Sequence, residues 1–176
     1  WVNVLSVPYK TMSIWGDAQL LRDRLEKIRG AAAVRMGMIK DAARSREDSP
    51  ATPILGLVSP PASYRNEING KDVAEDEVDL VSRLMFMQQS HKTYAGTSTV
   101  CTGVAARLPG TLVHEASRMQ TRNAVTVRIG HPAGVIETET KLSHTPKGWT
   151  VQRATLGRTA RRIMEGYVFV PGQGGS

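Results

Sequence analysis

The sequence predicts an α+β fold in one domain. Apolar residues recur at helical spacing in the first half of the chain, whereas turns that contain glycine or proline divide the second half into short strand-like runs. At 176 residues, of which 40% are hydrophobic, the chain is long enough to bury a core. Long helices followed by a strand-rich half favour an α+β fold.

A helix is expected over residues 17–36, and a buried strand after it. Asp17 is a suitable N-cap, and four apolar residues repeat at helical spacing: Leu21, Leu25, Ile28 and Ala32. A polar loop over residues 41–53 separates this helix from a strand over residues 54–58, which stops at Pro60-Pro61. Residues 1–8 predict a short strand that begins abruptly, as if another segment preceded it.

Two further helices and four further strands complete the prediction. One helix is expected from about Ala74 to Gln88, after an Asn69-Gly70 turn, with a buried stripe of Val78, Val81, Leu84 and Met85. The next runs from about Ser98 to Arg107. The expected strands cover residues 124–129, 135–140, 149–156 and 167–170. The domain would then span residues 1–171, with a flexible tail over 172–176.

Composition excludes several classes of function. The net charge of +7 is scattered, aromatic residues make up 5% of the chain, and no nucleic-acid motif is present, so anionic small substrates explain the charge at least as well as nucleic acid. No apolar run approaches the roughly 18 residues of a spanning helix, which argues against a membrane partner. The single cysteine, Cys101, favours a reducing, cytoplasmic compartment, and the four histidines lack metal-ligand spacing.

A candidate anion site lies at the start of the third expected helix. Thr97, Ser98 and Thr99 would add hydroxyl donors to backbone N–H groups that have no intrahelical partner, which suits a carboxylate or phosphate. The small residues that follow would let the helix pack closely. The alternative is that one hydroxyl merely caps a buried helix. Cys101, one turn further on, is either a thiol of lowered pKa or a small buried hydrophobe.

A second candidate lies in the turn Gly130-His131-Pro132-Ala133-Gly134. His131 is suited either to acid–base chemistry near neutrality or to fixing the shape of the turn. Arg158, with Arg161 and Arg162 nearby, offers a guanidinium for a carboxylate, or else a solvated basic face. From residue types alone, the chain predicts a small anionic ligand and either an isomerase or a binding module.

Several segments, taken in order, resemble the carboxy-terminal half of one enzyme family. The segments are residues 28–37, 78–83, 85–94, 100–111, 130–134 and 158–168. The family comprises 2-methylaconitate cis-trans isomerase, methylitaconate Δ-isomerase and 4-oxalomesaconate tautomerase, which have the diaminopimelate epimerase-like fold. The resemblance implies one half of a two-domain protein, with a mostly antiparallel, barrel-like sheet wrapped around a central helix that begins near Ser98.

The resemblance also implies a reaction. Members of the family move a double bond by removing and returning a proton, act on di- or tricarboxylates and use neither a metal nor an organic cofactor. Thr97, Ser98, Thr99, Gly130, His131, Gly134 and Arg158 would bind substrate carboxylates. The catalytic lysine of the family lies in the amino-terminal half, so the base would come from such a domain or from a second subunit.

Two positions depart from the family pattern. Ala133 stands where the turn usually carries serine, and Gly96 aligns with a catalytic cysteine of the related epimerases, which argues against Cys101 as the acid or base. The expected function is therefore double-bond isomerisation in an unsaturated acid such as 2-methylaconitate, with this chain as the carboxylate-binding half. The alternative is a non-catalytic anion-binding or oligomerisation domain derived from that family.

Overall fold

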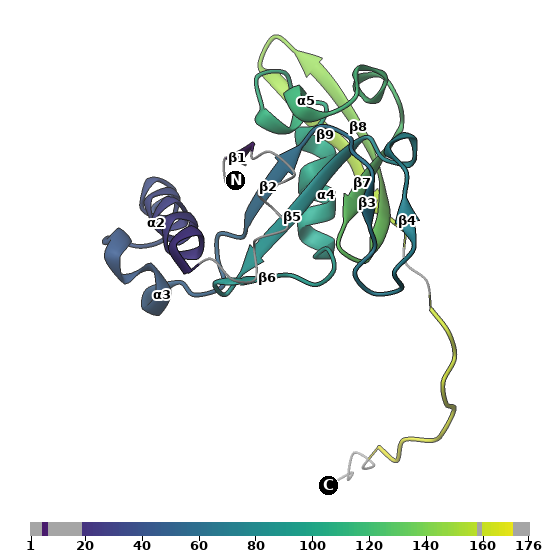
Figure 1. Ribbon diagram of the computed structural model, residues 1–176, viewed down its shortest axis with the longest axis horizontal. Coiled ribbons are helices and arrows are strands. Elements are labelled where there is room, and N and C mark those ends of the chain that lie inside the picture. Colours follow the sequence, from purple (N-terminus) through teal and green to yellow (C-terminus); the bar gives the residue numbers. More distant parts are fainter. Residues whose placement is uncertain (1–4, 7–18, 158–159, 171–176) are drawn as a thin grey trace, which may run out of the picture.

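The computed structural model describes residues 5–6, 19–157 and 160–170 (Figure 1). Its longer helices are α2 (Gln19–Arg35) and α4 (Gly96–Ala105), with the short helices α3 (Ser45–Asp48) and α5 (Leu112–Ala116) and the 3-10 turns η1 (Ala42–Arg44), η2 (Glu75–Glu77) and η3 (Met119–Arg122). Its strands are β1 (Leu5–Ser6), β2 (Leu55–Ser59), β3 (Tyr64–Arg65), β4 (Asp72–Val73), β5 (Leu80–Phe86), β6 (Gln89–Ser90), β7 (Thr126–His131), β8 (Gly134–Thr145) and β9 (Gly148–Leu156). The expected α+β class is confirmed.

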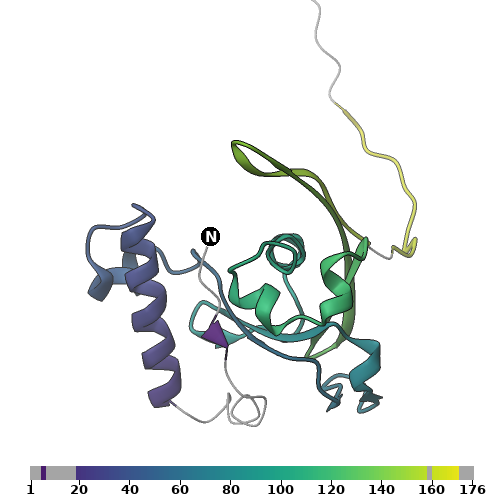
Figure 2. The same ribbon diagram turned by 90° about the horizontal axis from the view of Figure 1, so that it is seen from above.

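One curved sheet dominates the described part of the chain. Its strand order is β1-β2-β5-β7-β8-β9, with β6 paired to β5, and β3 and β4 form a separate hairpin. The β2–β5, β7–β8 and β8–β9 pairs are antiparallel, whereas β5 and β7 run parallel. Seen from above, the sheet curls around α4 and α5 (Figure 2). The expected barrel-like sheet around a central helix is therefore present.

The expected helix over Ala74–Gln88 is wrong. The acidic residues form only the short turn η2, and the segment after it is the central strand β5, in which six of seven residues are buried. Leu80 and Leu84 pack on the face of α4 and α5, while Val81 packs with the β3–β4 hairpin and Met85 lies near α2. Because both faces are covered, the polar–apolar alternation of a strand is lost.

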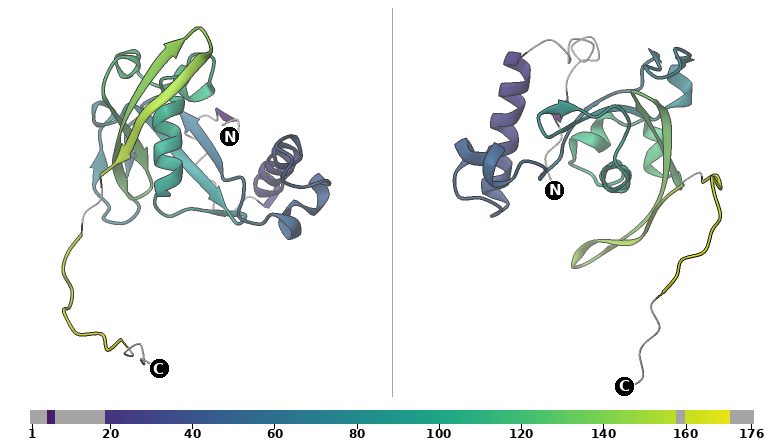
Figure 3. Two further views of the ribbon diagram at one scale, coloured as in Figure 1. Left: turned by 180° about the vertical axis from the view of Figure 1, so that it is seen from behind. Right: turned by 90° about the horizontal axis from the view of Figure 1, so that it is seen from below.

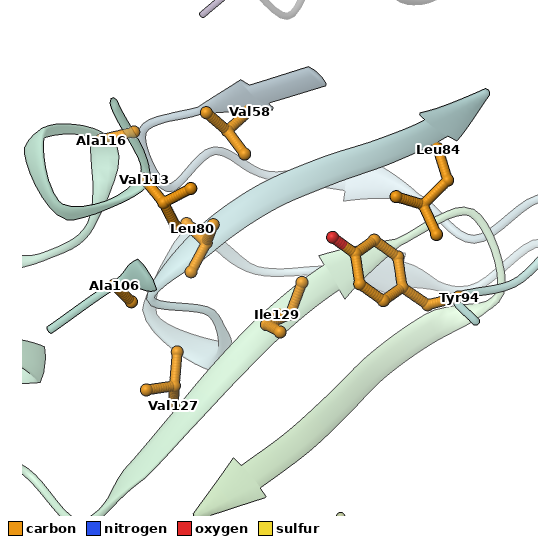
Figure 4. Packing of buried hydrophobic residues seen from close by; sticks show 9 residues of the cluster. All are labelled: Val58, Leu80, Leu84, Tyr94, Ala106, Val113, Ala116, Val127 and Ile129. Carbon is orange, nitrogen blue, oxygen red and sulfur yellow. The ribbon is translucent and has the colours of Figure 1, made fainter. Parts of the chain in front are cut away.

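The core lies between the sheet and its central helix. Nine buried residues from β2, β5, β7 and the α4–α5 region pack together: Val58, Leu80, Leu84, Tyr94, Ala106, Val113, Ala116, Val127 and Ile129 (Figure 4). The Tyr94 ring points into this cluster beside Leu84 and Ile129. This core fixes α4 against β5 and β7, and so positions the start of the helix.

The helix α2 packs outside the curve of the sheet (Figure 3). It confirms the expected helix over residues 17–36, although Asp17 lies outside the described residues. Leu25 contributes to a cluster with Leu55, Leu57 and Met85. Next to it the Arg29 guanidinium is buried and paired with Glu26 at 2.6 Å.

The expected loop over residues 41–53 contains η1 and α3, which the sequence did not predict. Arg29 Nη1 donates to the Ser49 and Thr52 carbonyl oxygens at 2.7 and 2.8 Å, and Nη2 donates to the Ser45 carbonyl at 2.9 Å. These bonds fold the segment back onto α2. They are made by a side chain distant in sequence, so local propensity could not indicate them.

Three of the four strands expected in the second half are present. They are β7, β8 and β9, and β8 continues five residues beyond the expected end at residue 140. Residues 167–170 are not a strand: they are exposed and have no regular structure. The sequence also missed α5 and η3. The expected tail over residues 172–176 lies outside the described residues.

Candidate functional site

The central helix α4 begins two residues earlier than expected, at Gly96. Its N-cap is Ala95, in an extended conformation, and no side chain caps the helix there. Thr97 is exposed, Ser98 is half-buried and Thr99 is fully buried. The Thr99 hydroxyl donates to the Ala95 carbonyl at 3.0 Å and is thereby engaged within its own helix. The N–H groups of the first turn have no intrahelical partner and lie at the positive end of the helix dipole.

Small residues allow α4 to pack closely against β8, as the sequence indicated. A Cβ atom added to Gly103 would lie 2.4 Å from Thr138 Cγ2, well inside any normal contact. One residue earlier, the Thr102 hydroxyl lies 2.9 Å from the Tyr94 hydroxyl, which donates to Ser82 Oγ at 2.8 Å. These contacts tie the middle of α4 to both β5 and β8.

The turn Gly130–Gly134 connects β7 to β8 as a tight hairpin. His131 pairs with Gly134, so Pro132 and Ala133 form a two-residue connection. Gly134 has φ +126°, a backbone conformation that side chains with a Cβ rarely adopt. Inside the turn, the Ala133 N–H donates to His131 Nδ1 at 3.2 Å. Glycine at position 134 is therefore required by the backbone of the turn itself.

The β3–β4 hairpin and the loop between its strands pack against this turn. The Tyr64 hydroxyl accepts from the His131 N–H at 3.1 Å and donates to the Gly134 carbonyl at 2.5 Å. The Glu67 N–H donates to the Pro132 carbonyl at 2.7 Å. Residues more than sixty positions earlier in the chain thus hold both sides of the turn.

The His131 imidazole is buried, with 8% of its surface exposed. Burial, followed by the nearby Arg83 guanidinium and then His91, lowers the pKa of His131 to about 4. The ring is therefore neutral at pH 7. Since Nδ1 accepts from Ala133, the proton of the neutral ring is assigned to Nε2, which makes His131 a hydrogen-bond donor rather than a base that titrates near neutrality.

Tyr94 connects the two candidate regions. It lies two residues before α4, and its ring centroid is 6.0 Å from that of His131. At the opposite side of the helix start, a Cβ on Gly96 would lie 3.5 Å from Leu156, which pairs with Thr138 on β8. The start of α4 and the Gly130–Gly134 turn therefore lie at the same end of the curved sheet.

Two of the remaining candidates, Cys101 and Arg158, lie on α4 and outside the described residues respectively. Cys101 is half-buried on the second turn of α4, and burial raises the pKa of its thiol to about 11, so the thiol is protonated at neutral pH. Arg161 and Arg162 are exposed, and Arg162 pairs with Glu165 at 3.0 Å. Among the residues that the structure describes, no cluster of histidine, cysteine and carboxylate side chains could hold a metal ion.

Sequence reasoning missed two buried residues beside the turn. The Arg83 guanidinium lies 5.0 Å from the centroid of the Tyr64 ring and 3.4 Å from the Gly130 carbonyl. Tyr64 and Arg83 make these contacts with residues on other strands, so no local motif in the sequence signalled them.

The parts of the chain that the structure describes include no helix long and apolar enough to cross a membrane.

Comparison with known proteins decides the family. The chain matches the PrpF protein family over residues 10–171. It belongs to this family. It is 51% identical over 155 residues to 3-methylitaconate isomerase of Eubacterium barkeri, covering 88% of this chain and 39% of that protein. It is 41% identical over 150 residues to 2-methyl-aconitate isomerase of Shewanella oneidensis, covering 84% of this chain and 36% of that protein.

A solved structure agrees with the sequence relatives. The crystal structure of methylitaconate-delta-isomerase superposes with a TM-score of 0.76 at 45% identity, covering 94% of this PrpF-family chain and 40% of that one. The chain spans about two fifths of the length of the relatives it matches, 39% and 36% for the two isomerases.

Proposed function

We propose that this PrpF-family chain is the carboxylate-binding part of a double-bond isomerase that acts on an unsaturated di- or tricarboxylate such as 2-methylaconitate. The observation that carries the proposal is that the start of α4, which has no side-chain cap, and the His131 turn both adjoin Tyr94, whose ring contacts that of His131. The chain is also 51% identical to 3-methylitaconate isomerase. As the family resemblance implies, we also propose that the chain corresponds to the carboxy-terminal half of these relatives.

The start of α4 supplies donors for one carboxylate. The N–H groups of Gly96, Thr97 and Ser98 are the first of the helix and lack intrahelical partners, and the Thr97 and Ser98 hydroxyls lie beside them. Neutral His131 would donate from Nε2 to a second carboxylate. Buried Arg83 adds positive charge behind the turn.

These donors also suit the reaction. Removal of a proton next to a carboxylate builds negative charge on its oxygens, and donors that are already oriented stabilise that charge without reorganisation. Neither His131, with a pKa of about 4, nor Cys101, with a pKa of about 11, is matched to proton transfer near pH 7. We therefore assign the base to another domain or to a second subunit, and the chain itself to substrate binding.

Binding without turnover is the expected behaviour of the isolated 176-residue chain. Isothermal titration with cis-aconitate, an unsaturated tricarboxylate, should show binding, whereas its neutral trimethyl ester should not bind. The purified monomer should not isomerise 2-methylaconitate. Turnover by the monomer would contradict the assignment of the base to another chain, and absence of binding would contradict the carboxylate-binding role.

The second candidate is a non-catalytic domain that mediates self-association. Six large apolar residues near the end of the chain are between 82% and 97% exposed, namely Ile163, Met164, Tyr167, Val168, Phe169 and Val170. Exposed apolar surface of this kind favours association. Native mass spectrometry distinguishes the two candidates: an oligomer whose mass is unchanged by cis-aconitate supports the second, and a ligand-bound species supports the first.

A further inference from the structure

We infer that Tyr64 is the positioning residue for the Gly130–Gly134 turn, and that its hydroxyl holds this turn in the conformation that binds a carboxylate. That the ligand is a carboxylate rests on the proposed function, whereas the positioning of the turn by Tyr64 rests on the geometry alone. Tyr64 is 5% exposed and belongs to the β3–β4 hairpin, which lies off the main sheet.

The Tyr64 hydroxyl joins both strands of the turn. It accepts from the backbone N–H of His131 and donates to the backbone carbonyl of Gly134, the two residues that face each other across the hairpin. The single hydroxyl therefore fixes the separation of the strands at the point where the His131 side chain leaves the backbone. A phenyl ring in its place would leave the buried His131 N–H and the partly buried Gly134 carbonyl without this partner.

The Tyr64 ring is itself held by its neighbours. A Cβ on Gly130 would lie 2.9 Å from Tyr64 Cε1, so the backbone of β7 contacts the ring directly. The Arg83 guanidinium lies over the ring, 5.0 Å from its centroid. Tyr64 also packs with Val73, Val78 and Val81. The hydroxyl is therefore presented to the turn by a ring that has little freedom to move.

This arrangement explains why an element outside the main sheet is packed onto the site. The loop between β3 and β4 adds the Glu67–Pro132 hydrogen bond, so the turn is held at Pro132 as well as at its two end residues, His131 and Gly134. The orientation of His131 follows from these contacts together with the Ala133–His131 bond inside the turn. Loss of the Tyr64 hydroxyl should change how His131 is presented while the ring packing remains.

The test compares Tyr64→Phe with Ser117→Ala in the full 176-residue chain. Ser117 is a matched control, because its buried hydroxyl donates to the Val113 carbonyl at the end of α5, away from the turn. Both variants lose one buried hydroxyl. Amide hydrogen exchange, an NMR titration of His131 and titration calorimetry with cis-aconitate are measured for each.

Tyr64→Phe should speed exchange of the His131 amide at least tenfold relative to Ser117→Ala, shift the His131 titration and weaken cis-aconitate binding five- to tenfold. Equal effects of the two variants on exchange and binding would overturn the inference. They would show that losing either hydroxyl only lowers the stability of the whole fold, with no specific effect on the His131 turn. If the unmodified chain does not bind cis-aconitate, the proposed function fails. Exchange and titration of His131 then decide whether Tyr64 positions the turn.

Discussion

The two parts of the candidate site are supported in different ways. The Gly130–Gly134 turn is held by side chains and backbone of other elements, through Tyr64, Glu67 and the ring contact with Tyr94. The start of α4 relies on its own helix: Ala95 provides no side-chain cap, and the Thr99 hydroxyl bonds back to the Ala95 carbonyl. Other elements therefore hold the turn in place, whereas the helix start has no side-chain cap on its first backbone N–H groups.

This difference predicts where substitutions are costly. A change in the braced turn disturbs several elements at once, so it should cost stability as well as binding. A change to the hydroxyls of exposed Thr97 and half-buried Ser98 on α4 should reduce binding and leave stability almost unaltered.

Gly130→Ala should destabilise the chain by about 2–3 kcal/mol, the upper part of the range for an overpacked core. The added Cβ would lie 2.9 Å from Tyr64 Cε1 and 3.1 Å from Val78 Cγ1, and the Tyr64 ring cannot move without breaking its bonds to the turn. Urea unfolding measures the loss. Gly157→Ala is the control, because a Cβ there meets nothing within 4 Å, and a similar loss in both variants would contradict the bracing.

The free energy of unfolding of the chain should decrease as the pH is lowered, because His131 becomes protonated. Its folded-state pKa of about 4 lies below the ordinary value of 6.5, so the unfolded state takes up the proton first as the pH falls. The stabilisation present above pH 6.5 is then lost toward pH 4, by about 2 kcal/mol between pH 6.5 and 4.5.

The control for this titration is His131→Asn, whose amide oxygen can still accept from the Ala133 N–H. Unfolding measured at both pH values should show a smaller pH dependence in the variant, since the carboxylates titrate alike in both proteins. Identical pH dependence of the two proteins would show that His131 is not buried in its neutral form.

Thr99→Val should cost about 1 kcal/mol of stability, the typical net value of one hydrogen bond. The substitution keeps the shape of the side chain and removes the hydroxyl that donates to the Ala95 carbonyl. Thr97→Val, at an exposed position on the same turn, is the matched control and should change stability by less than about 0.5 kcal/mol. Thermal unfolding of both variants should therefore separate the buried from the exposed hydroxyl.

The double variant Thr97→Ala/Ser98→Ala should have the smallest effect on stability, below about 0.5 kcal/mol, and should weaken cis-aconitate binding by about two- to fivefold. Its control is Thr150→Ala, an exposed threonine on β9. Titration calorimetry measures both. Unchanged affinity in the double variant would assign the anion contacts of α4 to its backbone N–H groups alone.

The sequence predicted those parts whose signal is local. Apolar residues at helical spacing indicated α2, hydroxyl residues followed by small residues indicated α4, and the hairpin between β7 and β8 has glycine at both ends of its turn. The strand β5 was missed because α4 and α5 cover one of its faces while the β3–β4 hairpin and α2 cover the other, so its apolar run also fits a helix. Burial on both faces is a property of the whole fold.

The candidate site divides in the same way. Thr97, Ser98 and His131 could be selected because hydroxyls near a helix start and a histidine in a turn of glycine and proline carry chemical meaning by themselves. Tyr64 and Arg83 could not, since their importance comes from contacts with Gly130, His131 and Gly134 far along the chain. Roles in substrate binding stay predictions for all the residues that the sequence selected, namely Thr97, Ser98, Thr99, Gly130, His131, Gly134 and Arg158.

The parallel pairing of β5 with β7 has a consequence for how the chain folds. Leu80 faces Ile129 across the centre of the sheet, and the chain between these strands includes α4 and α5. This contact cannot form until a long loop has closed, which makes it a slow, non-local step. Because α4 lies inside that loop and within the curve of the sheet, the helix is enclosed as the loop closes. The two parts of the candidate site should therefore form together with the core, in one cooperative transition.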